Sequence, residues 1–268
     1  MEDDRSPTLT LVCWCALIRE PTMNYHWNWA IFLAETPSGG TTYLGWMLSG
    51  LEVTLALSLS AWIIALLIGL LMGVLRTVPN RWLSGIAAFY VEVFRNTPLL
   101  VQLFIWYFVL PEIVPPSIGD AYKALNPFLQ QFLAAMLCLG LFTGARVCEQ
   151  VRSGINSLSV GQKYAGLALG FTLPQTYRYV ILPMAIRIIL PPLTSEFLNI
   201  FKNSAVASTI GLLELAAQGR QLVDYTAQPY ESFIAVTLMF MAINTVVMIL
   251  MHRVEKRARV PGHMGEER

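Results

Sequence analysis

The segment that most constrains the fold is an unbroken apolar run from Val53 to Leu75, which contains 23 residues and no charged side chain. A helix needs about 20 such residues to cross the hydrocarbon core of a bilayer. The composition agrees, because only 13% of all residues are charged, against about 25% in soluble domains. Only helices and closed barrels can span lipid, and a run of this length indicates a helix.

Two further runs, Ala124 to Ala145 and Phe233 to Met251, also lack charge and have the length of a span. Two weaker spans, from Trp82 to Leu110 and from Ile188 to Leu213, carry charged residues inside them. The chain is therefore predicted to be an all-α, polytopic membrane protein. We expect five transmembrane helices, at about residues 46–75, 82–111, 124–148, 186–213 and 230–252.

The first 22 residues differ from the rest of the chain. They begin with acidic residues, where a signal peptide begins with basic ones, and their apolar core from Leu9 to Ile18 is short. Our hypothesis is that translation starts at Met23 and that residues 1–22 lie upstream of this true start. A short interfacial leader is the alternative. Residues 23–268 would then form a single membrane domain.

Lys and Arg are distributed unevenly between the expected loops. None lies between Met23 and Leu75, and the loops after the second and fourth spans hold one each. Positive residues accumulate in cytoplasmic loops, so this bias predicts an N-terminus outside and a C-terminus in the cytoplasm. The basic residues that set the bias are Arg76, Arg81, Arg146, Arg152, Lys163, Arg178, Arg187, Arg253, Lys256, Arg257 and Arg259.

The segment 156–183, after the third span, is too polar to cross a bilayer yet reads as two short helices. Ser159 with Gln162, and Thr172 with Gln175, fit the spacing of capping boxes. Gly170 falls where a left-handed glycine ends a helix. Spacing alone leaves two interpretations open. The segment either packs on its own spans or docks a soluble partner.

Its pattern resembles the EAA loop of bacterial ABC importer permeases. That family pattern is Glu-Ala-Ala, three residues, Gly, nine residues, Ile-x-Leu-Pro. The spacing here is the same, with Tyr164 in place of Glu, Gly166 in place of the second Ala and Val180 in place of Ile. The resemblance implies a cytoplasmic coupling helix that sits in a cleft of an ATPase subunit. The residues it assigns to this role are Tyr164, Ala165, Gly166, Ala168, Gly170, Leu182 and Pro183.

Longer stretches resemble the permeases of polar amino acid importers. They include "YVEVFRNTPLLVQ" and "ILPMAIRIILPPLTSEFLNIFKNSAVASTIGLLEL". "WNWAIF", "TTYLGWMLSG" and "KNSAVASTIG" are most similar to the glutamate/aspartate permeases of that group. The resemblance implies a metI-like permease fold in the bacterial inner membrane and ATP-driven import of L-glutamate and L-aspartate. The alternatives are import of glutamine, histidine or arginine, and a stand-alone secondary carrier.

The same resemblance implies the partners. They are a dimer of ABC ATPase subunits, a second permease that is a related but different chain, an extracytoplasmic amino acid-binding protein and the lipid membrane. The sequence contains no G-x-x-x-x-G-K-[ST] phosphate loop. We therefore expect a transport subunit that is not itself an enzyme and carries no cofactor, with ATP and Mg used by the partner ATPase. A net charge of +1 gives no indication of nucleic-acid binding, and no cluster has metal-ligand spacing.

Charged residues inside spans are costly and are usually functional or paired. Glu92 and Arg95 share a helix face, which favours a structural pair; a pore-lining role for Arg95 is the alternative. Arg146, Glu149 and Arg152 read as a solvated or interface cluster.

In the fourth span, Ser195, Asn199 and Lys202 recur at helical spacing and form a polar stripe. A dicarboxylic amino acid needs positive charge and hydrogen-bond donors as it loses water. This stripe, with Arg95, is the candidate translocation path. Alternatively, Lys202 pairs with Glu52 or Glu196. Pro191 and Pro192 should bend the helix that carries it.

Overall fold

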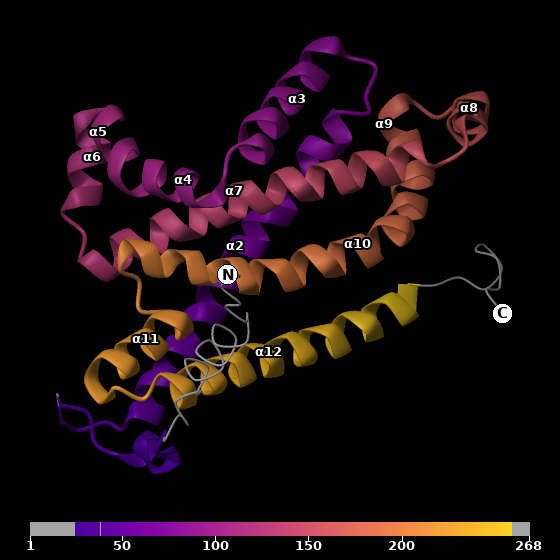
Figure 1. Cartoon of the computed structure of the whole chain (residues 1–268). Helices are drawn as coiled ribbons and strands as arrows, with labels where there is room; N and C mark the ends of the chain where they lie inside the picture. The colour runs from indigo at the N-terminus through magenta and orange to yellow at the C-terminus, as the bar shows by residue number, and fades with distance from the viewer. Residues whose placement is uncertain (1–24, 38, 259–268) are drawn as a thin grey trace, which may run out of the picture.

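The computed structural model describes residues 25–37 and 39–258. The expected leader at 1–22 and the expected start at Met23 lie outside these residues. Apart from one isolated bridge between Glu35 and Thr42, the described residues form helices and the turns that join them. The long helices are α2 (Tyr43–Leu75), α7 (Pro127–Asn156), α10 (Leu182–Asn203) and α12 (Pro229–Ala258) (Figure 1). The all-α prediction is confirmed.

Shorter helices connect these four. The 3-10 helix η1 precedes α2, and α6 leads from the second span into α7. The remaining short elements lie in the second span, in the loop after α7 and around α10. The short helices are η1 (Trp29–Leu33), α3 (Arg81–Asn96), α4 (Leu99–Phe104), η2 (Ile105–Val109), α5 (Leu110–Ile113), α6 (Pro116–Lys123), α8 (Val160–Ala168), α9 (Leu173–Thr176), η3 (Tyr177–Ile181), η4 (Ser204–Ile210) and α11 (Leu215–Thr226).

Four spans are long enough to cross a membrane unaided, and the predicted second span is a bent pair instead. The helix stops at Asn96, resumes at Leu99 and changes direction by 103°. The cause is local, because Pro98 disfavours helical geometry at the preceding residue, and Thr97 is extended. The five expected spans are therefore present when the bent pair counts as one, but an unbroken second helix is a wrong expectation.

Helices α2 and α7 pack against each other through glycines. Gly69 and Gly73 of α2 and Gly140 and Gly144 of α7 are each four residues apart. A Cβ on Gly69 would lie 2.6 Å from Val147 Cβ, and one on Gly140 would lie 2.8 Å from Ile64 Cβ. Small residues at this spacing let helix backbones approach closely in membranes. Helices α2 and α7 therefore pack closely against each other.

The helix α11 was not anticipated, because residues 214–231 read as a loop. It is polar on one face and buries the other against α2 and α12. Glu214 begins α11 by accepting hydrogen bonds from the backbone N–H groups of Ala216 at 3.0 Å and Ala217 at 2.8 Å. A Cβ on Gly219 would lie 2.3 Å from Val236 of α12. The short interval between the last two spans is thus a packed element.

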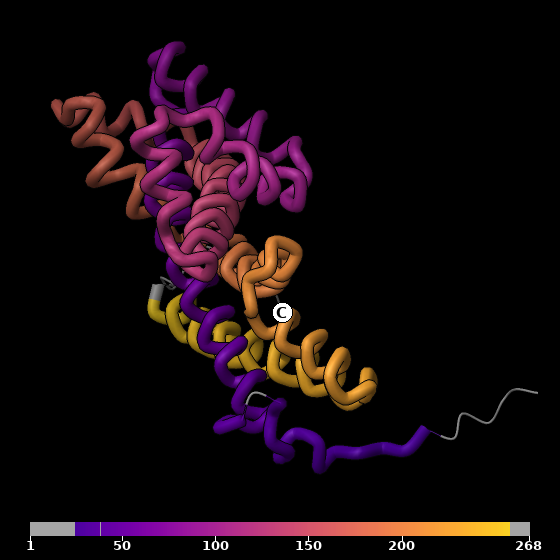
Figure 2. Tube along the Cα trace, turned by 90° about the vertical axis from the view of Figure 1, so that its left-hand side faces the viewer, coloured from indigo at the N-terminus to yellow at the C-terminus, as the bar shows by residue number. Residues whose placement is uncertain are grey.

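The elements expected at the cytoplasmic face lie together at one end. The turn between α2 and α3, the α8–α9 unit and the end of α12 are on the same side of the molecule in Figure 1. Figure 2 shows the α8–α9 unit projecting from the helices. Residues 25–37 and 39–42, together with α11, lie at the opposite end. This arrangement exposes the segment 156–183 to a partner.

Candidate functional site

Residues 156–183, named here the coupling loop, leave α7 at Asn156 and return to α10 at Leu182. Helix α8 ends in the predicted way, because Gly170 has φ +86°. Gly170 N–H donates to Leu167 O at 3.0 Å, and Phe171 N–H donates to Gly166 O at 3.2 Å. These two bonds form a Schellman motif. Ser159 does occupy the N-cap of α8, but its side chain makes no capping bond, so the first predicted capping box does not form.

The second capping box does form. The Gln175 side chain accepts from the Thr172 backbone N–H at 2.8 Å, and Pro174 lies in the first turn of α9. Behind α9, Thr176 is fully buried and fills the space beside Gly166, where a Cβ would lie 2.8 Å from Thr176 Cγ2. The small residue at 166 therefore serves contact inside the loop, whereas Ala165 is exposed.

The loop is held to the spans by the residues that precede α10. Tyr177 is buried and its hydroxyl donates to Thr77 O, in the turn after α2, at 2.8 Å. Ile181 is buried and Leu182 is half-buried against the same core. Pro183 is exposed at the start of α10. The helix continues there directly from the π-helix η3, and proline provides no backbone N–H to its hydrogen bonds. One side of the coupling loop is thus fixed to the membrane helices.

The other side of the coupling loop is apolar and uncovered. Tyr164 is 64% exposed and Leu169 is 77% exposed. Ala168 is also exposed between them. Uncovered large apolar side chains indicate an interaction surface, which favours the interpretation that the loop docks a partner. The large apolar residues of the face are Val160, Tyr164, Leu167, Leu169, Phe171 and Tyr179.

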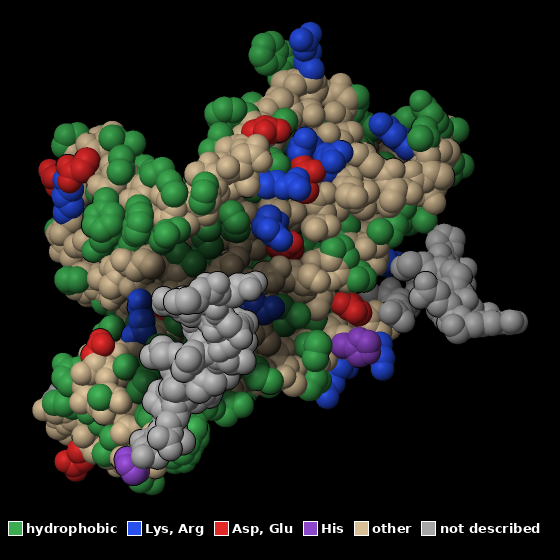
Figure 3. All heavy atoms as spheres, viewed as in Figure 1, with side chains coloured by type: hydrophobic (Ala, Val, Ile, Leu, Met, Phe, Trp, Pro, Cys, Tyr) green, Lys and Arg blue, Asp and Glu red, His purple; other side chains and the backbone are tan. Residues whose placement is uncertain are grey.

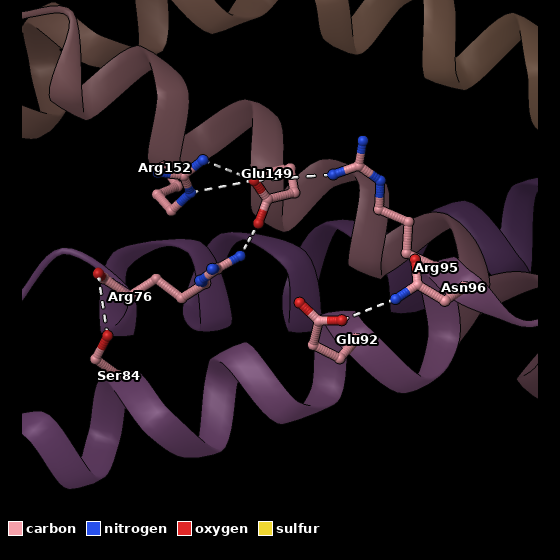
Figure 4. A network of polar contacts seen from close by, with 7 residues as sticks. All are labelled: Arg76, Ser84, Glu92, Arg95, Asn96, Glu149 and Arg152. Atoms are coloured by element: carbon pink, nitrogen blue, oxygen red, sulfur yellow. Dashed lines mark hydrogen bonds and ion pairs between the residues drawn. The ribbon is translucent and has the colours of Figure 1, made fainter.

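At the same end of the molecule, charged side chains gather where α3 meets α7 (Figure 3). Glu149 of α7 lies at their centre (Figure 4). It accepts from Arg152 Nη2 at 2.9 Å and pairs with Arg76 at the end of α2. Arg95 Nη1 is 4.0 Å from Glu149 Oε2. Glu149, Arg76, Arg95 and Arg152 are named here the Glu149 cluster.

The predicted pair of Glu92 with Arg95 is wrong. Glu92 accepts instead from Asn96 Nδ2 at 2.8 Å, one turn further along α3, and Arg95 turns toward Glu149 (Figure 4). A spacing of three residues permits an ion pair within one helix, but the fold places Arg95 beside the carboxylate of Glu149 on another helix. The Arg95 side chain remains 58% exposed.

One turn before Glu149, Arg146 joins α7 to α10. Its Nε donates to Glu196 Oε2 at 2.6 Å and its Nη2 to Glu196 Oε1 at 3.1 Å. The Glu196 side chain is only 6% exposed, so this two-bond geometry satisfies a carboxylate that water does not reach. It also excludes the expected pairing of Lys202 with Glu196.

The residues of the predicted polar stripe, named here the α10 stripe, share one face of α10. Ser195 and Lys202 are exposed and Asn199 is half-buried. Within the described chain, no hydrogen bond or ion pair engages these three side chains. The stripe faces away from the core of this chain. Pro191 and Pro192 lie inside the same helix, where neither can donate a backbone bond.

Sequence reasoning missed two features of this end of the molecule. The central role of Glu149 could be traced only as far as its spacing from Arg152, because its other partners come from distant segments. The contact of Tyr177 with the α2–α3 turn has no signal in the sequence. No group of three or more potential metal ligands is found among the described residues.

Comparison with known proteins gives concordant matches. The family model described as "Binding-protein-dependent transport system inner membrane component" matches residues 65–260. The glutamate/aspartate import permease protein GltJ of Escherichia coli K12 is 59% identical over 244 residues, which cover 91% of this chain and 99% of that protein.

Solved structures share the fold. A chain of an amino acid ABC transporter crystallised with histidines superposes with a TM-score of 0.68 at 32% identity, covering 80% of this chain and 95% of that one. A chain of the MetNI methionine ABC transporter, in an inward-facing conformation, gives 0.68 at 21% identity, covering 82% and 100%. The metI-like fold expected from the sequence is confirmed.

Proposed function

Since the chain belongs to the family of inner membrane components of binding-protein-dependent transport systems, we propose that it is the permease subunit of an ATP-driven importer of L-glutamate and L-aspartate. The observation that carries the proposal is 59% identity, over 91% of this chain, to a permease described as importing glutamate and aspartate. The chain itself is a transport subunit, and ATP with Mg is used by a partner ATPase.

The coupling loop is the surface on which an ABC ATPase dimer docks. Its apolar face around Tyr164, Leu167 and Leu169 is exposed, and its other side is fixed to the spans through Tyr177. A partner that binds this face can therefore push or pull on the ends of the helices. Ala165 and Ala168 are exposed and let the partner approach the backbone of α8.

A second permease, related but different, completes the passage. The α10 stripe supports this because Lys202 and Ser195 face away from the core of this chain, and a polar stripe facing lipid would be costly. Lys202 and Asn199 offer a positive charge and an amide donor to a dicarboxylate that crosses the membrane. An extracytoplasmic binding protein delivers the amino acid at the end formed by residues 25–37, residues 39–42 and α11. The N-terminus is outside and the C-terminus cytoplasmic.

Uptake of labelled L-glutamate tests the substrate. We would compare cells that lack the gene with the same cells after the gene is restored, using unlabelled aspartate, glutamine, histidine and arginine as competitors. We expect restored uptake that only glutamate and aspartate block. Competition by glutamine, histidine or arginine instead would replace the substrate while keeping the transporter class.

The energy source is tested in the same cells. An uncoupler should leave uptake intact as long as cellular ATP is maintained, because hydrolysis by the partner drives the movement. Loss of uptake under those conditions would favour a stand-alone secondary carrier.

Docking is tested at Gly170, whose φ of +86° no proline can adopt. Gly170→Pro should abolish uptake and retention of the ATPase while leaving membrane insertion unchanged. Gly161→Pro is the matched control, because position 161 is in the first turn of α8, where proline is tolerated. Normal uptake by the Gly170 variant would contradict docking at this loop.

A further inference from the structure

The turn between α2 and α3 contacts both the coupling loop and the Glu149 cluster. Thr77 O accepts the Tyr177 hydroxyl at 2.8 Å. The neighbouring residue, Arg76, pairs with Glu149, and its backbone oxygen accepts from Ser84 of α3 at 3.4 Å. Tyr177 is therefore connected to Glu149 through two adjacent residues of one short turn.

The Glu149 carboxylate joins α2, α3 and α7 through contacts of unequal strength. Arg152 and Arg76 hold its carboxylate closely, whereas Arg95 is at 4.0 Å and is largely exposed. One carboxylate faces three guanidinium groups, so the positive charge of the cluster is not fully compensated by Glu149. Because Arg95 is the most weakly held of the three, its contact is the one that a small movement of Glu149 would make or break.

Arg95 lies at the end of α3, directly before the break in the second span. Across that break, Gln102 Nε2 donates to Phe94 O at 2.7 Å and to Thr97 O at 2.9 Å. Gln102 is buried in α4, so its side chain bonds α4 to the last turn of α3 and to the residue after it, across the bend of 103°. The geometry of the break is therefore fixed by specific hydrogen bonds, and Arg95 is the charged group beside it.

We propose that Tyr177 and Glu149 are positioning residues that carry movement of the ATPase-docked coupling loop, through the α2–α3 turn and Arg95, to the broken second span. This inference rests on the proposed function. A clamp that merely holds the helix ends together would use the same contacts, but its loss would lower assembly and stability without changing how much substrate moves per ATP. The ratio of uptake to hydrolysis therefore separates the two roles.

The experiment uses the complete transporter in proteoliposomes, with both permeases, the ATPase and the binding protein, and measures glutamate uptake and ATP hydrolysis together. Glu149→Gln removes the charge and keeps the shape. Glu92→Gln is the matched control, since Glu92 lies nearby but bonds to Asn96. We expect Glu149→Gln to lower uptake per ATP about tenfold while hydrolysis continues, and Glu92→Gln to change the ratio less than about twofold.

Tyr177→Phe removes only one hydroxyl and is expected to fold, so it keeps the proposal testable if Glu149→Gln fails to assemble. We expect it to lower uptake per ATP about threefold. Combined with Glu149→Gln it should cause no more than about the tenfold loss of the stronger single variant, because residues on one route are not additive.

If the double variant lowered uptake per ATP by the product of the two single losses, Tyr177 and Glu149 would act on independent routes, and the inference would be overturned. An unchanged ratio in Tyr177→Phe or in an assembled Glu149→Gln complex would also overturn it. The proposed function fails separately, and the inference with it, if the unmodified complex shows no ATP-dependent uptake of glutamate.

Discussion

Glu196 and Ser195 are neighbours on α10, yet they belong to two regions with opposite character. Glu196 is buried and held by Arg146 through two hydrogen bonds, while Ser195 begins the exposed α10 stripe. Paired groups in a membrane protein satisfy one another and fix helix positions. Unpaired groups need something else to satisfy them. The comparison therefore predicts that the first region contributes to stability and that the other contacts substrate or a second chain.

The largest effect is expected from breaking the paired region. Arg146→Met leaves the buried Glu196 carboxylate without its partner, and we expect a loss of about 3 kcal/mol in stability. Thermal unfolding of the purified complex in detergent measures it.

Arg95→Met is the control for that loss. Arg95 is largely exposed and contacts Glu149 at 4.0 Å, so its removal should cost no more than about 0.5 kcal/mol. A second check combines Arg146→Met with Glu196→Leu, which should recover much of the stability because no buried charge is left alone. Equal unfolding temperatures for Arg146→Met and Arg95→Met would contradict the distinction between buried and peripheral pairs.

The sequence predicts the helices and turns of the molecule better than the contacts between them. The uncharged run that ends at Leu75 predicts α2 because length and apolarity alone decide a span. Gly170 is predictable because a left-handed residue after a helix has a strong local preference for glycine. Both features depend on residues close together in the chain.

The pairing of charges depends on helices that meet only in the fold. Spacing suggested that Arg95 bonds to Glu92, whereas the approach of α3 to α7 brings it to Glu149. Local patterns rank possible partners within one helix, but they contain no information on competition from another helix. The break at Thr97–Pro98 is different, since the restriction before proline could have predicted it. The long apolar stretch from Trp82 to Leu110 favoured a single span, so the effect of Pro98 was not used.

A smaller effect, on transport and not on stability, is expected in the α10 stripe. Lys202 is exposed and unpaired within the described chain, so Lys202→Met should leave the unfolding temperature unchanged. Glutamate uptake should fall about tenfold if the ammonium attracts the carboxylates of the substrate. Lys202→Arg keeps the charge and should retain most of the uptake. Unchanged uptake in an assembled Lys202→Met complex would make the stripe a structural feature.

The smallest effects sharpen the comparison at two adjacent residues. Thr194 donates to Glu255 of α12 at 2.5 Å, so Thr194→Val should lower stability by about 1 kcal/mol with little specific effect on uptake. Ser195→Ala removes an exposed hydroxyl and should change stability by less than about 0.5 kcal/mol, while reducing glutamate uptake about twofold if the stripe lines the passage. Unfolding temperature and initial uptake rate, measured on both variants, test the division. The opposite result, with Ser195→Ala destabilising and Thr194→Val neutral, would mean that exposure within this single chain does not reveal which face of α10 is used for transport.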